Sequence, residues 1–369
     1  MERENKGMND IYSNSRPPRK NEKAKKYSRK VRISVNVFLS VALALCILVS
    51  CAFYVLGYAN FSDDGGTSAK DMVGIQPSKS EDVSYFLVTG TDESGDLTDI
   101  IMVVCFDIKA KTANILQIPR DTYIGSDIPS GKINAVYESA SKGESRINTL
   151  MKRINDYLGL PIDHYMVVSI EAFRDVVDTV GGIDVYVPVT MNAYDSKDVL
   201  HRIEKGTQHL DGGEAEAYIR HRGSYAMGDL GRVEAQRNFY AAFIKAMLSM
   251  SSTQMVSVAT KCYDDFATDM KLADLLAYAN LAKNLTTETI SFYAVPGQAG
   301  SYNPQGITRS YYSIHKQEYV DLINDHFLPY EEYYRTVDDL KIEELHSSYE
   351  SNYLTNDEQG LEGYINGDN

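Results

Sequence analysis

The chain has 369 residues and a formal net charge of −14. Its first 32 residues carry eleven Lys/Arg and four Asp/Glu, a net of +7, which leaves −21 for the remainder. Such an acidic remainder repels polyanions and argues against a nucleic-acid binder, so a local basic pocket must hold any anionic ligand. The sequence has only four cysteines and no H-E-x-x-H, C-x-x-C, P-loop or G-x-S-x-G pattern. It therefore predicts neither a disulfide scaffold, nor a metallopeptidase, nor a triad hydrolase.

An uncharged apolar stretch follows the basic N-terminus, from Ile33 to Tyr58. At the helical rise its 26 residues span about 39 Å, more than a hydrocarbon core of about 30 Å. The positive-inside rule then predicts a basic cytoplasmic tail (1–32), a transmembrane helix (33–58) and an extracytoplasmic remainder, a single-pass protein of the cell membrane. A cleaved signal peptide is the alternative, but no small-residue cleavage site ends the apolar stretch. Leu48 to Cys51 resembles a lipoprotein box, yet the chain stays apolar beyond it.

A polar stalk (59–83) precedes a region in which strand and helix patterns alternate. The strand patterns are Tyr85–Thr89, Ile100–Asp107, Ala113–Ile118, Tyr165–Ser169, Ile183–Val187 and Thr289–Val295. The helix patterns are Ile147–Leu158, Ile170–Val180, Asp229–Met250 and Leu272–Leu285, with a further helix starting near Gly213. This alternation predicts an α/β fold, an α-β-α sandwich with a central mixed β-sheet, in a domain of residues 84–328. Residues 329–369 are acidic and Tyr-rich, and predict a mobile tail.

Two cysteines lie in the apolar stretch, which leaves Cys105 in a strand pattern and Cys262 far along the chain. Outside the cell these two could form one disulfide, or they could remain as two buried thiols. The sequence favours two buried thiols but does not decide between this state and the disulfide.

Two carboxylates lie where strands end or begin. Asp92 follows a strand and a glycine turn, and Asp99 opens the next strand. If the strands are neighbours, both carboxylates meet at the carboxyl end of the sheet, where α/β proteins place ligand groups. One or two carboxylates together with a phosphate form a plausible Mg²⁺ site, with Mn²⁺ as the substitute. The plainer interpretation is that Asp92 stabilises a turn and Asp99 a strand start.

Basic side chains also occupy the ends of predicted elements. Arg120 follows the third strand, and Arg220 and Arg222 can serve one anion only if the helix near Gly213 has already ended. Arg232 and Gln236 share one face of the long helix. Each arginine alone is best explained by a surface ion pair, but their joint placement favours a pocket for phosphate, which matches the guanidinium fork. Ser139 to Lys142 satisfies S-x-x-K without its partner motif and predicts only a loop.

The order of these motifs resembles the LytR-CpsA-Psr family over residues 84–252. The matching segments are Gly90-Thr91-Asp92, Thr98-Asp99, Ile118 to Tyr123, Lys132 to Ala135, Val176 to Val185, Leu210 to Gly212, Tyr218 to Arg222 and Asp229 to Arg232. The resemblance implies a cell-envelope phosphotransferase that moves a teichoic-acid-like or capsular glycopolymer from its polyprenyl-pyrophosphate carrier onto peptidoglycan, with Mg²⁺ at the pyrophosphate.

Carried over residue by residue, the resemblance implies that Asp92 and Asp99 are metal ligands and act in catalysis with Arg120. It also implies six residues that bind the pyrophosphate, of which Lys132 and Arg232 act as supporting charges. These residues are Arg120, Lys132, Arg220, Arg222, Arg232 and Gln236. The chain departs from the family pattern twice. Leu97 stands where the family has an arginine, and Ala235-Gln236 stands where it has Arg-Gln.

The implied reaction is attack by a peptidoglycan hydroxyl on the glycan-side phosphorus, with polyprenyl phosphate leaving. The general base is open, with Asp92 and Asp121 as candidates. Because Leu97 stands in place of an arginine, the protein could alternatively be a non-catalytic receptor or scaffold for lipid-linked wall precursors. A polyprenyl-pyrophosphate hydrolase is a further alternative. A transcriptional regulator is disfavoured because the short cytoplasmic tail has no room for a folded DNA-binding module.

Overall fold

The computed structural model describes residues 82–91, 95–225, 229–304, 306–330, 334–346, 351–354 and 359–360. The expected cytoplasmic tail (1–32), transmembrane helix (33–58) and nearly all of the stalk lie outside these ranges, as does Asp92. Among the described residues, no helix combines the length and the apolar character that a membrane span needs.

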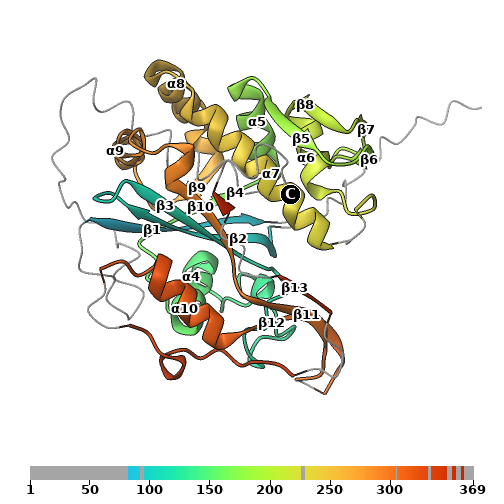
Figure 1. The fold of residues 1–369 in the computed structure, drawn as a ribbon, viewed down its shortest axis with the longest axis vertical. Coiled ribbons are helices and arrows are strands. Elements are labelled where there is room, and N and C mark those ends of the chain that lie inside the picture. The colour runs from blue at the N-terminus through green and yellow to red at the C-terminus, as the bar shows by residue number, and fades with distance from the viewer. Residues whose placement is uncertain are drawn as a thin grey trace, which may run out of the picture. The chain divides into compact units, whose positions relative to one another are not determined.

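A seven-stranded mixed sheet forms the centre of the fold (Figure 1), in the order β14-β10-β3-β2-β1-β4-β9. Its strands are β1 (Val83–Thr91), β2 (Thr98–Asp107), β3 (Thr112–Ile118), β4 (His164–Val168), β9 (Phe266–Thr268), β10 (Ile290–Ala294) and β14 (Gln359–Gly360). β1 and β4 are parallel, as are β3 and β10, while β2 runs antiparallel between β1 and β3. The predicted α/β fold with a central mixed sheet is thus confirmed.

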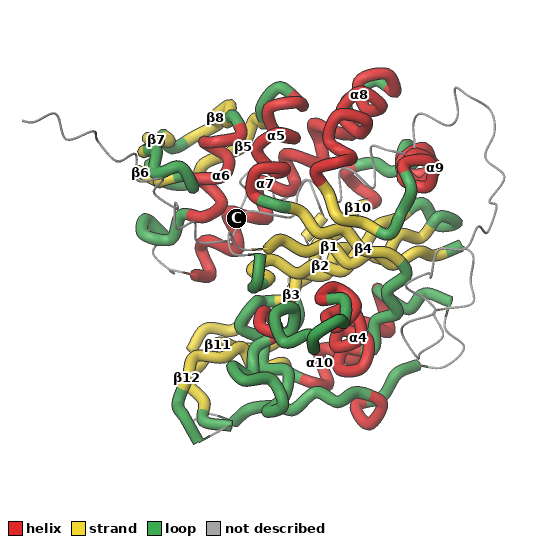
Figure 2. Tube along the Cα trace, turned by 180° about the vertical axis from the view of Figure 1, so that it is seen from behind, coloured by secondary structure: helices red, strands yellow, loops and turns green. Residues whose placement is uncertain are grey.

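Helices cover both faces of this sheet, as Figure 2 shows from behind. One face carries α5 (Ile170–Val180), α6 (Gly212–Arg220), α7 (Asp229–Leu248), α8 (Ser252–Cys262) and α9 (Leu272–Ala282). The other carries α4 (Arg146–Leu158) and α10 (Lys316–His326). Alternate side chains of β1 enter different cores: Phe86 and Val88 pack under α5 to α9, and Tyr85 and Leu87 pack against α4 and α10. Period-two alternation therefore builds a core on each face.

The two remaining cysteines are free and buried. Cys105 belongs to the core beneath α4 and α10, whereas Cys262 belongs to the core on the other face. Since the sheet lies between them, they form no disulfide, and the buried-thiol alternative is the one observed. Burial raises the pKa of Cys105 to about 12 and that of Cys262 to about 11, so both remain protonated and unreactive.

Three small sheets flank the central one. Two are hairpin-like pairs, β5 (Ile183–Val187) with β8 (Gly206–Leu210) and β6 (Met191–Tyr194) with β7 (Leu200–Ile203). The third has the order β12-β11-β13 and comprises β11 (Gly297–Tyr302), β12 (Arg309–Ile314) and β13 (Ser351–Leu354).

Part of the expected mobile tail packs on the domain. Residues 334–346 bury Leu340 and Ile342 in the core beneath α4 and α10. Asn324 of α10 exchanges two hydrogen bonds with the backbone of Arg335, of 2.9 and 2.8 Å. In this stretch the structure differs from the expected mobile tail, because Leu340 and Ile342 bury their side chains although charged residues surround them in the sequence.

Candidate functional site

The strand ends that the sequence singled out meet at one edge of the sheet. Because β2 is antiparallel to its neighbours, its first residues lie beside the last residues of β1 and β3. The register shifts between Gly90 and Thr91: Gly90 faces Ile100, and Thr91 faces Thr98. Asp99 is therefore the extra residue of a bulge, a feature that redirects side chains at functional edges.

Four side chains form a chain of alternating charges at this edge, which we call the strand-edge cluster: Asp99, Arg120, Asp121 and Lys132. Nη1 of Arg120 donates to Oδ2 of Asp99 at 3.0 Å, and its Nε lies 3.9 Å from Oδ2 of Asp121. Nζ of Lys132 donates to Oδ1 of Asp121 at 2.8 Å. The side chain of Asp99 is only 5% exposed, while the other three are 22 to 30% exposed. A buried carboxylate thus orients Arg120, which stays accessible to a ligand.

Backbone hydrogen bonds hold the loop that carries this cluster. The amide of Tyr123 donates to the carbonyl of Tyr312 at 2.9 Å, and the amide of Tyr312 donates to the carbonyl of Asp121 at 2.9 Å. Nζ of Lys132 also lies 5.8 Å from the ring centroid of Tyr311. The loop after β3 is therefore fixed against β12.

Arg220 is the last residue of α6, and the next residue, His221, is extended. The helix has therefore ended before Arg222, the condition that the sequence set for two arginines to serve one anion. Nη1 of Arg220 donates to Oε1 of Glu216 at 2.5 Å. Glu216 is fully buried and also accepts from Arg174 at 3.0 Å and from the amide of Ser196 at 2.6 Å. Sequence reasoning missed Glu216, although its i, i+4 spacing to Arg220 predicts the pair.

The first half of α7 brings buried polar residues over the sheet, among them Arg232, Gln236 and Arg237. Nε2 of Gln236 donates to the carbonyl of Ile219 at 3.0 Å, which joins α7 to the end of α6. Nε of Arg237 donates to Oε1 of Gln117 at 3.1 Å, near the end of β3. Arg237 was not among the predicted residues, although it directly follows Gln236. It connects the helix residues with the strand that leads to Arg120.

His221 lies between Arg220, the last residue of α6, and Arg222. Its Nε2 accepts a hydrogen bond from the amide of Ser224 at 3.0 Å and lies 2.7 Å from the Ser224 hydroxyl. Burial lowers the pKa of His221, so the ring is neutral near neutral pH. Because an amide can only donate, Nε2 must be the unprotonated nitrogen.

Next to Leu97, where the family resemblance implies an arginine, another cation reaches the neighbouring backbone. Nη1 of Arg146, the first residue of α4, donates to the carbonyl of Gly95 and to Oδ1 of Asp96, both at 2.8 Å. Arg146 therefore supplies a positive charge to the segment just before Asp99, although from a different element.

The donor set at the edge is compatible with a hard divalent cation. Within the described part of the chain, no three His, Cys, Asp or Glu side chains gather closely enough to hold a metal by themselves. Mg²⁺ needs only one or two carboxylates when phosphate and water complete its shell. Asp99 provides such a carboxylate, and Asp92 lies outside the described residues.

The structure thus shows an α/β domain in which Arg120 and Lys132 lie with two carboxylates at one edge of its sheet. Arg220 is paired with Glu216 at the end of α6, and Arg232 is buried in α7. The chain belongs to the LytR_cpsA_psr family, whose model matches residues 54–327. A curated relative is the polyisoprenyl-teichoic acid–peptidoglycan teichoic acid transferase TagV of Bacillus subtilis, 30% identical over 72% of this chain and 71% of the relative. A second, the corresponding transferase TagU of Bacillus cereus, is 36% identical over 49% of this chain and only 57% of the relative.

Solved structures agree in fold. The crystal structure of B. subtilis TagV matches with a TM-score of 0.56 and 30% identity, covering 66% of this chain and 95% of that one. A structure described as TagT bound to LIIa-WTA matches with a TM-score of 0.53 and 26% identity, covering 72% and 97%.

Proposed function

We propose that this protein is a phosphotransferase that attaches a polyprenyl-pyrophosphate-linked glycopolymer, teichoic-acid-like or capsular, to peptidoglycan. The observation that carries the proposal is the Asp99–Arg120 pair of 3.0 Å at a sheet edge in a strongly acidic chain. The names of the relatives TagV and TagU, which describe the transfer of teichoic acid to peptidoglycan, support it.

The reaction needs positioning and charge neutralisation more than covalent catalysis. A peptidoglycan hydroxyl attacks the glycan-side phosphorus, forming one P–O bond, while the P–O bond to the leaving polyprenyl phosphate breaks. The hydroxyl proton passes to a base, for which Asp92 and Asp121 are the candidates. Arg120, Arg220 and Arg222 take up the charge that develops on the phosphate oxygens, as preorganised donors do. Lys132 keeps Asp121 in place at 2.8 Å.

We assign Asp92 and Asp99 as the residues that would hold Mg²⁺ or Mn²⁺. A bound divalent ion would neutralise charge on the pyrophosphate oxygens. In the absence of substrate, the pairing of Asp99 with Arg120 keeps that buried carboxylate satisfied, since an unpaired buried charge is costly.

We also propose that residues 33–58 anchor the chain in the cell membrane, with the N-terminus cytoplasmic and the domain outside. A polyprenyl carrier resides in the bilayer, so an anchor keeps the domain close to its donor. Protease added to intact, wall-stripped cells should digest the domain. Full protection of the domain would contradict this topology.

A second candidate function is a receptor that binds lipid-linked wall precursors without turnover, and the loss of an arginine at Leu97 favours it. The test is reconstitution of the full chain with a lipid-pyrophosphate glycan and peptidoglycan fragments. A transferase forms glycan-bearing peptidoglycan and releases one polyprenyl phosphate per product, and a chelator abolishes both. A receptor binds the donor and releases nothing, with or without metal, and a hydrolase releases polyprenyl phosphate without joining glycan to peptidoglycan.

A further inference from the structure

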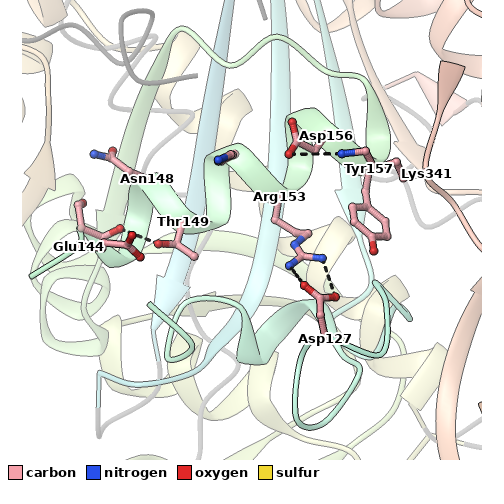
Figure 3. Close-up of a pocket in the computed structure, with 10 residues that line it drawn as sticks. Asp127, Glu144, Asn148, Thr149, Arg153, Asp156, Tyr157 and Lys341 are labelled. Carbon is pink, nitrogen blue, oxygen red and sulfur yellow. Dashed lines mark hydrogen bonds and ion pairs between the residues drawn. The ribbon is translucent and has the colours of Figure 1, made fainter. Parts of the chain in front are cut away.

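A polar cavity of about 610 Å³ lies beside α4, on the face of the sheet away from α5 to α9 (Figure 3). Its volume falls within the range of about 300–1,000 Å³ that is usual for ligand sites. Exposed side chains at its border, such as Asp127 at 59% and Lys341 at 64%, leave it open to solvent. None of the residues assigned to the pyrophosphate site lines it.

The charges around this cavity balance. Three carboxylates and three cations line it, and two of the cations are paired within it. Nη1 of Arg153 donates to Asp127 at 3.0 Å, and Nζ of Lys341 lies 3.8 Å from Asp156. This leaves no net positive field to attract a polyanion. All ten lining residues are polar or are tyrosine, so the cavity also lacks the apolar wall that a lipid chain needs.

The remaining lining groups suit an uncharged ligand rich in hydroxyl and amide groups. Tyr157 places an aromatic ring at the cavity, with one ring face covered by Arg153, whose guanidinium carbon lies 4.8 Å from the ring centroid. Asn148 and Thr149, both about two turns before it on α4, provide an amide and a hydroxyl. Sugars are bound in this way, with a C–H face against an aromatic ring and hydroxyl and N-acetyl groups hydrogen-bonded to amides and carboxylates.

A single loop connects the cavity with the strand-edge cluster. The loop begins at Asp121 and ends at Lys132, the two residues paired at 2.8 Å beside Arg120. Its middle carries Asp127, and Arg153 also donates to the carbonyl of Ile124 at 3.2 Å. A glycan bound in the cavity therefore lies next to the loop that begins at Asp121, a candidate for the general base.

One border of the cavity lies outside the part of the chain that matches the family. The family match ends at residue 327, and Lys341 comes from the segment 334–346. Burial of Leu340 and Ile342 fixes this segment against the domain. One of the ten lining residues therefore lies outside the residues that the family model matches.

We infer that this cavity binds the glycan strand of peptidoglycan that accepts the polymer, an inference that rests on the proposed function. Its balanced charge and hydrogen-bonding groups select an uncharged amino-sugar chain over the anionic polymer of the donor. The loop then brings a hydroxyl of that strand towards the sheet edge.

The test is binding of a peptide-free probe, a β-1,4-linked N-acetylglucosamine tetramer, to the detergent-solubilised full chain, measured by calorimetry without donor lipid. Two variants test the cavity: Asn148→Ala combined with the replacement by alanine of Lys152, the third cation of the lining, and separately Lys341→Ala. The matched control is Lys261→Ala, an exposed lysine of α8 on the opposite face. We expect each cavity variant to weaken tetramer binding about ten-fold or more and to raise the KM for peptidoglycan fragments, with the KM for the donor lipid unchanged.

Three results would overturn the inference. They are an unchanged tetramer affinity in both cavity variants, an equal loss in the Lys261→Ala control, or binding of poly(glycerol phosphate) in place of the tetramer. Each of these leaves the transferase proposal intact if transfer still proceeds. If no protein transfers polymer, the proposed function fails, while the binding measurement still decides whether the cavity holds glycan.

Discussion

Arg120 is the residue whose surroundings best define the site. It is held by the nearly buried Asp99 at 3.0 Å and remains about a quarter exposed. Its replacement by alanine should remove a charge-assisted contact of about 1.5–3 kcal/mol and weaken pyrophosphate-lipid binding roughly ten-fold or more. Calorimetry with the lipid measures this. Arg202→Ala, which breaks an exposed pair with Glu204, is the control and should bind normally. Equal affinities of both variants for the lipid would show that Arg120 forms only a surface ion pair.

A substitution at Leu97 tests whether the lack of the arginine that the family resemblance implies there limits activity. The residue precedes β2 by one position and lies beside Asp96, whose charge Arg146 balances. Leu97→Arg adds a cation near the pyrophosphate, so the transfer rate should rise or at least stay the same. The measurement is initial rate at saturating donor. A clear fall in rate, with the variant still folded by circular dichroism, would show that position 97 does not face the pyrophosphate in this chain.

Local sequence could predict much of the site because strand ends and helix ends mark it. Asp99, Arg120 and Arg220 each lie at or near such an end, where the structure gives them polar partners. Gln236 lies within α7 and donates to the carbonyl of Ile219 near the end of α6. Glu216 and Arg237 were missed for a physical reason. Each has a partner on an element distant in sequence, Arg237 with Gln117 at 3.1 Å and Glu216 with Arg174 at 3.0 Å, and one-dimensional patterns do not contain those contacts. Only the pair of Glu216 with Arg220 is local.

At the scale of elements, the turn between α6 and α7 should respond to pH. Folding lowers the pKa of His221 below its ordinary value of 6.5, so its contribution to stability is present above that value and is lost as the pH falls through the lowered pKa. Protonation of Nε2 removes the acceptor for the Ser224 amide. We therefore expect protection of that amide from hydrogen exchange to fall in acid. His221→Gln, which cannot titrate, should abolish the pH dependence. Protection that is independent of pH in both proteins would contradict this role.

The segment 334–346 should contribute to stability through its buried side chains. Leu340 packs so closely on the α4 cap residue Gly159 that a Cβ there would lie 2.6 Å from its Cδ2. Leu340→Ala should lower the free energy of unfolding by about 2–5 kcal/mol, as other buried leucines do. Urea denaturation measures this, with the 78%-exposed Tyr334→Ala as a nearly neutral control. A similar small loss in both variants would mean that the segment is not packed in solution.

Strongly periodic elements were predictable, and short or interrupted ones were not. The pattern at Ile170–Val180 predicted α5 with its bounds, since Ser169 caps its start and Gly181 adopts the left-handed conformation at its end. The helix α8 was missed because its apolar residues are few, although Ser251 and Gln254 form the capping box that could have located it. The hairpin of β6 and β7 was missed because four-residue strands carry too little alternation.

At the scale of the whole molecule, alternation of strands and helices predicted the fold class but not the strand order. That order depends on which strands pair across long sequence separations, such as β3 with β10. Because β2 runs antiparallel between β1 and β3, its start lies beside the ends of both. Asp99 and Arg120, which are 21 residues apart in the sequence and opposite in charge, thereby become neighbours in a chain of net charge −14.

The most direct measurement is reconstituted transfer from a lipid-pyrophosphate glycan to peptidoglycan fragments, comparing the unaltered protein with Asp99→Ala. We predict metal-dependent product and equimolar polyprenyl phosphate from the unaltered protein, and no turnover from a folded Asp99→Ala variant, because this carboxylate orients Arg120 and is assigned to the metal. No product from the unaltered protein with metal and native donor lipids, or full activity in the variant, would contradict the account.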